Sequence, residues 1–164
     1  MGLDCYLYRE AYISHDEYKD GEFIQPSVTI KYNKRKDDHN NGRTFKPTYI
    51  IEEIGYWRKA NHIHSYFVDK FANGIDECQR INISYQDLVD LRGICQDIIT
   101  KSKSNTNWGD FANSVLPTRK GFFFGGTEYD EWYLQDCQHL IDIVDMLDKD
   151  KYANMDDFYY RASW

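Results

Sequence analysis

The sequence has no long hydrophobic run, no paired cysteines and no excess of basic residues, and each absence excludes a class of protein. No stretch approaches the roughly 20 apolar residues of a membrane-spanning helix, and the N-terminus lacks the apolar segment of a secretion signal. The four cysteines are scattered without a Cys-x-x-Cys pair, which argues against a zinc knuckle or a small disulfide scaffold. A formal net charge of −7 argues against general nucleic-acid binding. We therefore expect a protein of the cytoplasm with no membrane partner.

Familiar catalytic motifs are also missing. The sequence contains no Gly-x-Ser-x-Gly segment, and no cysteine has the local signature of a nucleophile. The glycines of Gly121–Gly126 lack the lysine and spacing of a Walker A loop and the three glycines of a dinucleotide fingerprint. A metal held by Glu128, Asp130 and His64 has no diagnostic spacing. The sequence thus predicts no cofactor and no metal site, and it leaves open whether the protein is an enzyme.

Aromatic residues and an uneven charge distribution are the features that stand out. Aromatic residues make up 16% of the chain, with 14 Tyr and 4 Trp, and such side chains suit interfaces and ligand clefts, including an interface between copies of the chain. Five cations against two aspartates give Lys34–Lys46 a charge of +3. Ten acids against two lysines give Gly121–Phe158 a charge of −8. The first segment has no apolar periodicity, so we expect a mobile basic loop over residues 34–46.

Hydrophobic periodicity predicts one α+β domain over residues 1–164, with an antiparallel or mixed β-sheet and about three helices packed on one side. Residues alternate between apolar and polar from Leu3 to Ile13, which is typical of a half-buried strand. A polar linker is expected over Lys101–Gly109. The further predicted strands are Phe23–Tyr32, Thr48–Tyr56, Gln79–Ile83, Gly121–Gly125 and Phe158–Trp164, and the predicted helices are one ending at Asn73-Gly74, one opened by a capping box at Ser84–Asp87 and one running from Thr127 to about Lys149.

The richest group of functional side chains lies at the start of the first predicted helix. At 100° per residue, His64 falls on the apolar stripe of this helix, and Trp57 and Asn61 lie along its border. We therefore expect these three side chains to line one cavity; the alternative is that His64 is a core histidine with its hydrogen bonds satisfied and that the neighbouring cations are solvated. Arg58 and His62 fall elsewhere on the helix and are expected to face solvent or a partner.

Two cations in the first turn of this helix, Arg58 and Lys59, oppose the helix dipole and are suited to holding an anion. At the later helix, Thr127 is the expected N-cap with Asp130 as its partner, because acids near a helix N-terminus complement the dipole. The predicted ligand-binding residues are Tyr6, Trp57, Arg58, Lys59, Asn61 and His64.

Four segments together resemble a family of small, uncharacterised phage and prophage proteins that begin Met-Gly-Leu-Asp-Met-Tyr-Leu. The similarity spans nearly the whole chain, and Cys5 replaces the usual methionine, which is a mild apolar exchange. It implies an accessory role in a bacterial host cytoplasm, and it carries no activity over. The segments that support the resemblance are Met1–Leu7, Tyr56–His64, Leu116–Gly125 with Tyr129–Glu131, and Phe158–Trp164.

Three classes of function remain open, and the third of them is an assembly or structural role. In the first, a phage-type accessory protein acts by binding and inhibits a host defence system. It would block a host protein through the acidic helix face of Asp142, Asp145 and Asp148, or sequester a small anionic, nucleotide-like ligand in the predicted pocket. In the second, a small phosphoesterase or nucleotide hydrolase uses His64 as its acid–base residue. The anion would then be stabilised by Arg58 or Lys59, and Glu128 or Asp130 would orient His64 or hold a metal.

Overall fold

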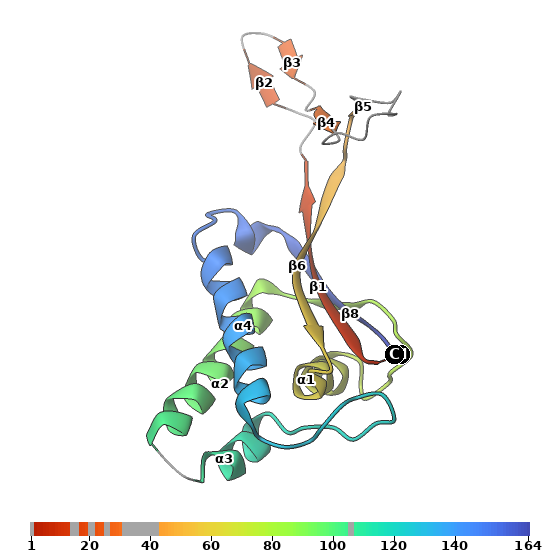
Figure 1. The fold of residues 1–164 in the computed structure, drawn as a ribbon. Helices are drawn as coiled ribbons and strands as arrows, with labels where there is room; N and C mark the ends of the chain where they lie inside the picture. The colour runs from red at the N-terminus through yellow and green to blue at the C-terminus, as the bar shows by residue number, and fades with distance from the viewer. Residues whose placement is uncertain (1, 14–16, 20–21, 25–26, 31–42, 105–106) are drawn as a thin grey trace, which may run out of the picture. The chain divides into compact units, whose positions relative to one another are not determined.

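The computed structural model describes residues 2–13, 17–19, 22–24, 27–30, 43–104 and 107–164. The chain divides into two compact units, one containing the residues up to Arg9 together with Glu52–Trp164, and the other containing Glu10–Ile51. The first unit contains all the described helices and the candidate site. Figure 1 shows the order of the elements along the chain.

An antiparallel sheet in the order β6-β1-β8-β7 forms the framework of the first unit (Figure 1). The strands are β1 (Asp4–Tyr12), β6 (Tyr49–Arg58), β7 (Ile81–Ile83) and β8 (Asp157–Ser163), of which β1 and β6 continue into the second unit. On the edge of the sheet, β7 pairs with β8 so that Asn82 lies opposite Tyr159. At the start of β1 burial alternates, with Cys5 and Leu7 buried and Asp4 and Tyr6 partly exposed, as the period of two predicts.

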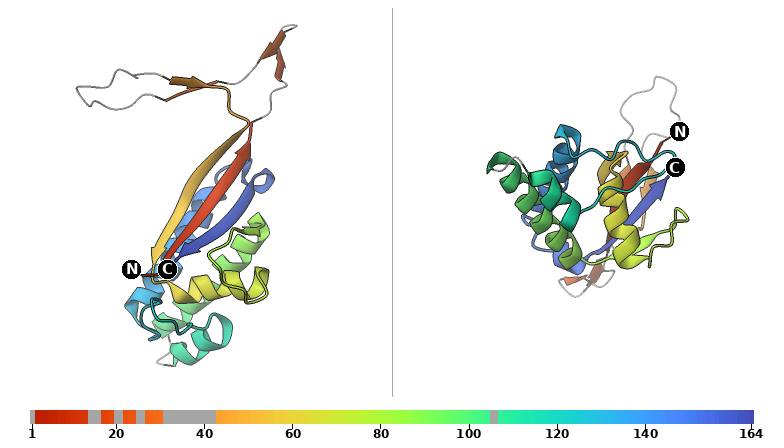
Figure 2. Two further views of the ribbon diagram at one scale, coloured as in Figure 1. Left: turned by 90° about the vertical axis from the view of Figure 1, so that its right-hand side faces the viewer. Right: turned by 90° about the horizontal axis from the view of Figure 1, so that it is seen from below.

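Four helices lie on one side of this sheet (Figures 1 and 2). They are α1 (Asn61–Phe71), α2 (Tyr85–Ser104), α3 (Trp108–Val115) and α4 (Glu131–Leu147), followed by one 3₁₀ turn, η1 (Ala153–Met155). The α2 and α4 helices pack against each other, and α3 packs against α2. The predicted α+β class with helices on one side of the sheet is therefore confirmed.

The core is formed where α1, α2 and α4 meet the inner face of the sheet. The apolar positions recur at helical spacing on the helices and at every second position on β1, which places them all on the inward faces. The fully buried side chains of this core include Leu3, Leu7, Ile63, Phe67, Leu88, Leu91, Ile98, Leu140, Phe158 and Tyr160.

In the second unit, the described strands form two short antiparallel pairs. The first pair joins β2 (Glu17–Lys19) to β3 (Glu22–Ile24), and the second joins β4 (Val28–Ile30) to β5 (Arg43–Phe45). Where Phe23–Tyr32 is predicted as one strand, the described residues form β3 and β4. The predicted loop over residues 34–46 lies mostly outside the described residues, but its end is wrong, because Arg43–Phe45 pairs with β4.

The capping box that opens α2 is confirmed by reciprocal hydrogen bonds. The Ser84 amide donates to an Asp87 carboxylate oxygen over 2.9 Å, and the Asp87 amide donates to Ser84 Oγ over 3.2 Å.

The predicted linker over Lys101–Gly109 is wrong at both ends. Helix α2 continues to Ser104, and α3 begins at Trp108, because a polar sequence with good helix formers need not interrupt a packed helix.

The strand predicted over Gly121–Gly125 is wrong. The Phe124 amide donates to the Gly121 carbonyl over 3.2 Å, which closes a turn, and Phe122 is 94% exposed. Gly125 follows with a φ of +87°, a conformation that favours glycine. A short run of phenylalanines resembles a buried strand in sequence, but these glycines turn the chain instead.

None of the helices in the described part of the chain combines the length and apolar character that crossing a bilayer demands.

Candidate functional site

A cavity of about 290 Å³ lies where the N-terminus of α1 meets the loop before α4 and the first turns of α4. Its volume is near the lower end of the range of about 300–1,000 Å³ typical of small-molecule sites. We call it the α1 cavity. It is lined by Arg58, Lys59, Asn61, His62, Thr118, Gly126, Glu128, Asp130, Trp132, Tyr133 and Asp136.

The backbone at the start of α1 holds two cations at this cavity. Lys59 has a φ of +65°, and its amide donates to the Leu3 carbonyl over 2.7 Å, which anchors the bend between β6 and α1 to the first strand. Ala60 is the N-cap residue, and in the described structure no side chain caps this helix and no acid lies in its first turn. No side chain of the first turn of α1 therefore compensates the positive end of its dipole, which lies beside Arg58 and Lys59.

Asn61 fastens the loop before α4 to the start of α1. Its Nδ2 donates to the Phe124 carbonyl over 3.0 Å and to the Gly126 carbonyl over 2.7 Å. Its Oδ1 accepts from the Arg119 amide over 3.0 Å. These three bonds satisfy most of the capacity of the buried amide, so Asn61 positions the cavity wall.

His62 was predicted to face solvent or a partner, and this prediction is wrong. Only 3% of the residue is exposed, because the first turns of α1 are buried on every side and the Tyr133 ring of α4 stacks on the imidazole with 4.0 Å between ring centroids. Within the described structure, His62 Nε2 is buried and has no hydrogen-bond partner. Leaving such an atom unpaired costs about 1–3 kcal/mol, so its presence calls for an explanation.

Burial also determines the charge of His62. Loss of solvation lowers the pKa of His62 to about 3, so the ring is neutral at physiological pH. A neutral imidazole has one nitrogen that donates and one that accepts. His62 lines the α1 cavity, and its ring has a hydrogen-bonding capacity that no protein group in the described structure uses.

Acidic residues from the loop before α4 and from α4 also line the cavity. Asp130 is the N-cap of α4, since its Oδ1 accepts from the amides of Trp132 and Tyr133 over 3.0 and 3.1 Å. The predicted cap, Thr127, is therefore wrong. Burial, and to a smaller degree the charge of Asp130, raises the pKa of Asp136 to about 7. The Asp136 carboxyl is thus able to donate or accept a hydrogen bond near neutral pH.

Of the six predicted ligand-binding residues, three line this cavity: Arg58, Lys59 and Asn61. His64 does not line it, although it lies only two positions from His62. The ring of His64 is buried, with Nδ1 at 2.8 Å from the Tyr160 hydroxyl and Nε2 at 2.9 Å from Asp76. Burial lowers the pKa of His64 despite the Asp76 carboxylate. Both ring nitrogens already have partners in the core.

Trp57 and Tyr6 also lie away from the cavity. The Trp57 side chain is buried, and its Nε1 donates to the Asp136 carbonyl over 3.2 Å, which ties β6 to α4. The Tyr6 ring lies on the outer side of β1, between the rings of Tyr8 and Tyr56. The prediction that Trp57, Asn61 and His64 share one cavity is therefore wrong, because the inward stripe of α1 is filled by the core.

The catalytic and metal arrangements considered from the sequence do not form. Glu128 and Arg58 line the α1 cavity, but His64 is hydrogen-bonded elsewhere. Among the described residues, no group of three histidines, cysteines or acids is placed to hold a metal ion. The acidic helix face is also partly neutralised, because Arg92 pairs with both Asp145 and Asp148.

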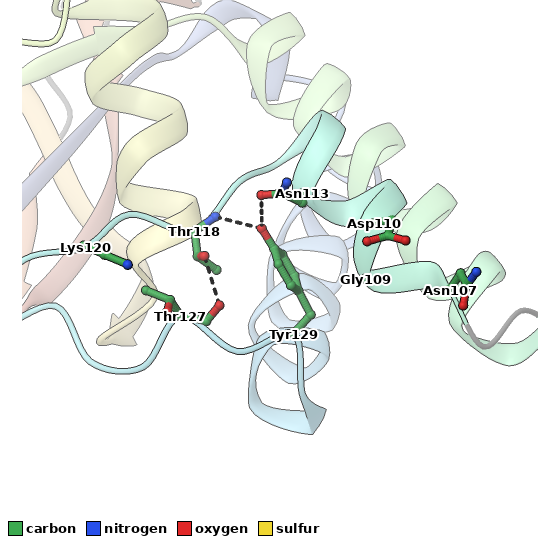
Figure 3. A pocket seen from close by; sticks show the side chains of 8 residues that line it. All are labelled: Asn107, Gly109, Asp110, Asn113, Thr118, Lys120, Thr127 and Tyr129. Atoms are coloured by element: carbon green, nitrogen blue, oxygen red, sulfur yellow. Dashed lines mark hydrogen bonds between the residues drawn. The ribbon is translucent and has the colours of Figure 1, made fainter.

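A second, more open hollow of about 570 Å³ adjoins the first (Figure 3). We call it the α3 hollow. Thr118 lines both spaces. The other residues that line the α3 hollow are Asn107, Gly109, Asp110, Asn113, Lys120, Thr127 and Tyr129.

Three features of the α1 cavity could not be found by sequence reasoning. His62 and Asp136 have no motif around them, and they become notable only when packing buries one and half-buries the other. Trp132 is 72% exposed and lies in the first turn of α4, and hydrophobic periodicity gives no reason to expect a functional residue there. The sequence did contain one signal for this site, a histidine close to two cations and an amide. This group lies at the start of α1, which lines the cavity.

No family model, curated protein or solved structure matches this chain. The functional argument therefore depends on the geometry of the site, and the resemblance to phage proteins stays a prediction.

Proposed function

We propose that the protein acts by binding a small anionic, nucleotide-like ligand in the α1 cavity. The observation that supports this most directly is that His62, whose buried Nε2 has no hydrogen-bond partner in the described structure, lines the cavity together with Arg58 and Lys59. The resemblance to phage accessory proteins adds the setting of the proposal: the ligand is captured in a bacterial host cytoplasm, and its removal inhibits a host defence system.

The cationic side of the cavity suits a phosphate. Arg58 presents a planar guanidinium that matches phosphate oxygens, and Lys59 adds a second positive charge. The uncapped N-terminus of α1 contributes the positive end of its dipole at the same place. The negative charge of a phosphate bound here would compensate the charges of Arg58 and Lys59 and the positive end of the helix dipole.

The remaining lining of the cavity suits the polar edge of a ring. A nucleobase edge presents hydrogen-bond donors and acceptors side by side, and the neutral His62 and the Asp136 carboxyl can complement both. Exposed Trp132 offers an indole on which a base can stack. The acidic residues on this side disfavour a second phosphate there, which orients the ligand with its anionic group toward Arg58 and Lys59.

The geometry favours ligand capture over the other functions considered. Hydrolysis with His64 as acid–base residue requires that imidazole to reach a ligand, but Tyr160 and Asp76 occupy both of its nitrogens. Blocking a protein through the acidic face requires free carboxylates, but Arg92 pairs with two of the three.

Calorimetric titration of the wild-type protein with the common 5′-mononucleotides tests the proposal. His62→Phe keeps an aromatic ring against Tyr133 and removes the unpaired nitrogen. We expect this variant to be at least as stable as wild type, because an apolar ring replaces an unsatisfied polar group, while nucleotide affinity falls about tenfold. His139→Phe on the exposed side of α4 is the matched control, with unchanged affinity expected.

Two results would overturn the proposal. Either no nucleotide binds, or a nucleotide binds equally well to wild type and to His62→Phe. In a second measurement, the protein is denatured after incubation with the nucleotide, and the released compound is identified by mass spectrometry. Recovery of the unchanged compound supports binding, and recovery of a hydrolysed product would show that the protein is an enzyme.

A further inference from the structure

The α1 cavity and the α3 hollow share a wall. Thr118 lines both spaces, and the segment Gly126–Asp130 supplies residues to each. The α1 cavity is about half the volume of the α3 hollow, at about 290 and 570 Å³. The two spaces are therefore neighbours, separated by Thr118.

Hydrogen bonds hold the wall of the α3 hollow in place (Figure 3). The Tyr129 hydroxyl donates to Asn113 Oδ1 over 2.8 Å and accepts from the Thr118 amide over 3.3 Å. Thr118 Oγ1 donates to the Thr127 carbonyl over 3.1 Å. The three segments that form this wall are thus tied together before any ligand arrives, which lowers the conformational cost of binding.

The α3 hollow has the chemistry of a site for a polar, largely uncharged group. Its lining side chains are amides and hydroxyls together with one acid and one lysine, so their charges balance. Such a surface matches the hydroxyls of a sugar and the polar edge of a base better than it matches a second phosphate or an alkyl chain.

Lysines lie on both sides of the shared wall. Lys59 lines the α1 cavity, and Lys120 lines the α3 hollow, where its side chain points toward Thr118 and Thr127 (Figure 3). A phosphate that links two nucleoside units would pass over Thr118 between these two cations.

We propose that the ligand is a dinucleotide, with one nucleotide unit in the α1 cavity and the second nucleoside in the α3 hollow. This inference rests on the proposed function, since it extends the same ligand. The inference predicts that each nucleotide unit contributes to the free energy of binding and that linking the two units increases affinity. Once the first unit is bound, the linkage holds the second unit close to its own subsite.

Calorimetry with four probes tests the inference: adenosine and guanosine 5′-monophosphates, and the corresponding 5′-phosphorylated dinucleotides. We expect the better dinucleotide to bind wild type at least about tenfold more tightly than its mononucleotide. Lys120→Ala should reduce this advantage several-fold and leave mononucleotide affinity unchanged. Lys103→Ala, an exposed lysine in the last turn of α2 outside both spaces, is the control and should change neither.

The possible failures are distinguishable. If mononucleotides and dinucleotides bind equally and Lys120→Ala affects neither, the dinucleotide inference is wrong and the proposed function stands. If none of the four probes binds, the proposed function fails and the inference fails with it. If Lys120→Ala weakens both kinds of probe equally, the two spaces are not separate subsites and the inference is likewise wrong.

Discussion

At the scale of single residues, two histidines on one turn of α1 have different roles. Both His64 nitrogens are paired, with Tyr160 and Asp76, so this ring helps to hold the core together. His62 is equally buried, but its Nε2 has no partner in the described structure. The physical difference is the environment on the two sides of the helix, since one side meets the core and the other meets the α1 cavity.

The pH dependence of stability follows from two shifted groups that act in opposite directions. Because the pKa of Asp136 rises from 3.8 to about 7 on folding, the native state binds more protons than the unfolded state in this range. Its contribution to stability is therefore present below about pH 4 and is lost as pH rises to 7. Because the pKa of His62 falls from 6.5 to about 3, its contribution is lost as pH falls below 6.5.

Urea denaturation of wild type and two variants between pH 4 and 8 measures these contributions. Relative to wild type, Asp136→Asn should gain free energy of unfolding as pH rises from 4 to 7. His62→Phe should gain it as pH falls from 6.5 toward 4. Parallel pH profiles for all three proteins would show that neither group is perturbed by burial as described.

At the scale of elements, the loop between α3 and α4 contributes residues to both the α1 cavity and the α3 hollow. Asn61 fixes one part of this loop to α1, and Tyr129 fixes another part to α3. The loop has no regular secondary structure, so its shape depends on these bonds and on Gly125, whose φ is +87°. An ideal Cβ at this glycine would lie 2.9 Å from Lys59 Cβ, so the close approach of the two segments requires glycine.

Two glycine substitutions test whether this loop requires glycine in a way that an ordinary helix position does not. Gly125→Ala should lower the free energy of unfolding by about 1–2 kcal/mol, because alanine disfavours a positive φ, and should weaken nucleotide binding by displacing Lys59. Gly93→Ala within α2, where nothing lies within 4 Å of the added Cβ, should raise stability by about 0.5–1 kcal/mol. Equal effects in urea denaturation would contradict this account of the loop.

Elements with strong periodicity or capping signals could be predicted from the sequence, and those that depend on long-range contacts could not. The alternation in β1 and the Ser84 capping box identify their elements locally. Helix α3 packs against α2, and the turn at Gly121–Gly125 is held by hydrogen bonds to Leu3 and Asn61 in addition to its local bond; no local pattern contains these distant contacts. The same limit applies to the site: the cations beside α1 could be found, and the partnership of His62 with α4 could not.

At the scale of the whole molecule, the first unit has a simple plan in which one sheet supports helices on one side and the site lies at the start of α1. The α+β class follows from the order of strands and helices along the chain. The prediction of one domain over the whole chain stays a prediction, as does self-association through the aromatic residues. The residues that line the α1 cavity and the α3 hollow all belong to the first unit.

The most direct test of the central claim is a nitrogen NMR titration of the histidine side chains with the mononucleotide that binds most tightly. Long-range proton–nitrogen spectra resolve the ring nitrogens of each histidine. The account predicts that Nε2 of His62 shifts as the ligand supplies its missing hydrogen bond, while both nitrogens of His64 keep their positions. An unchanged His62 signal at saturation, or a shift at His64 in its place, would contradict it.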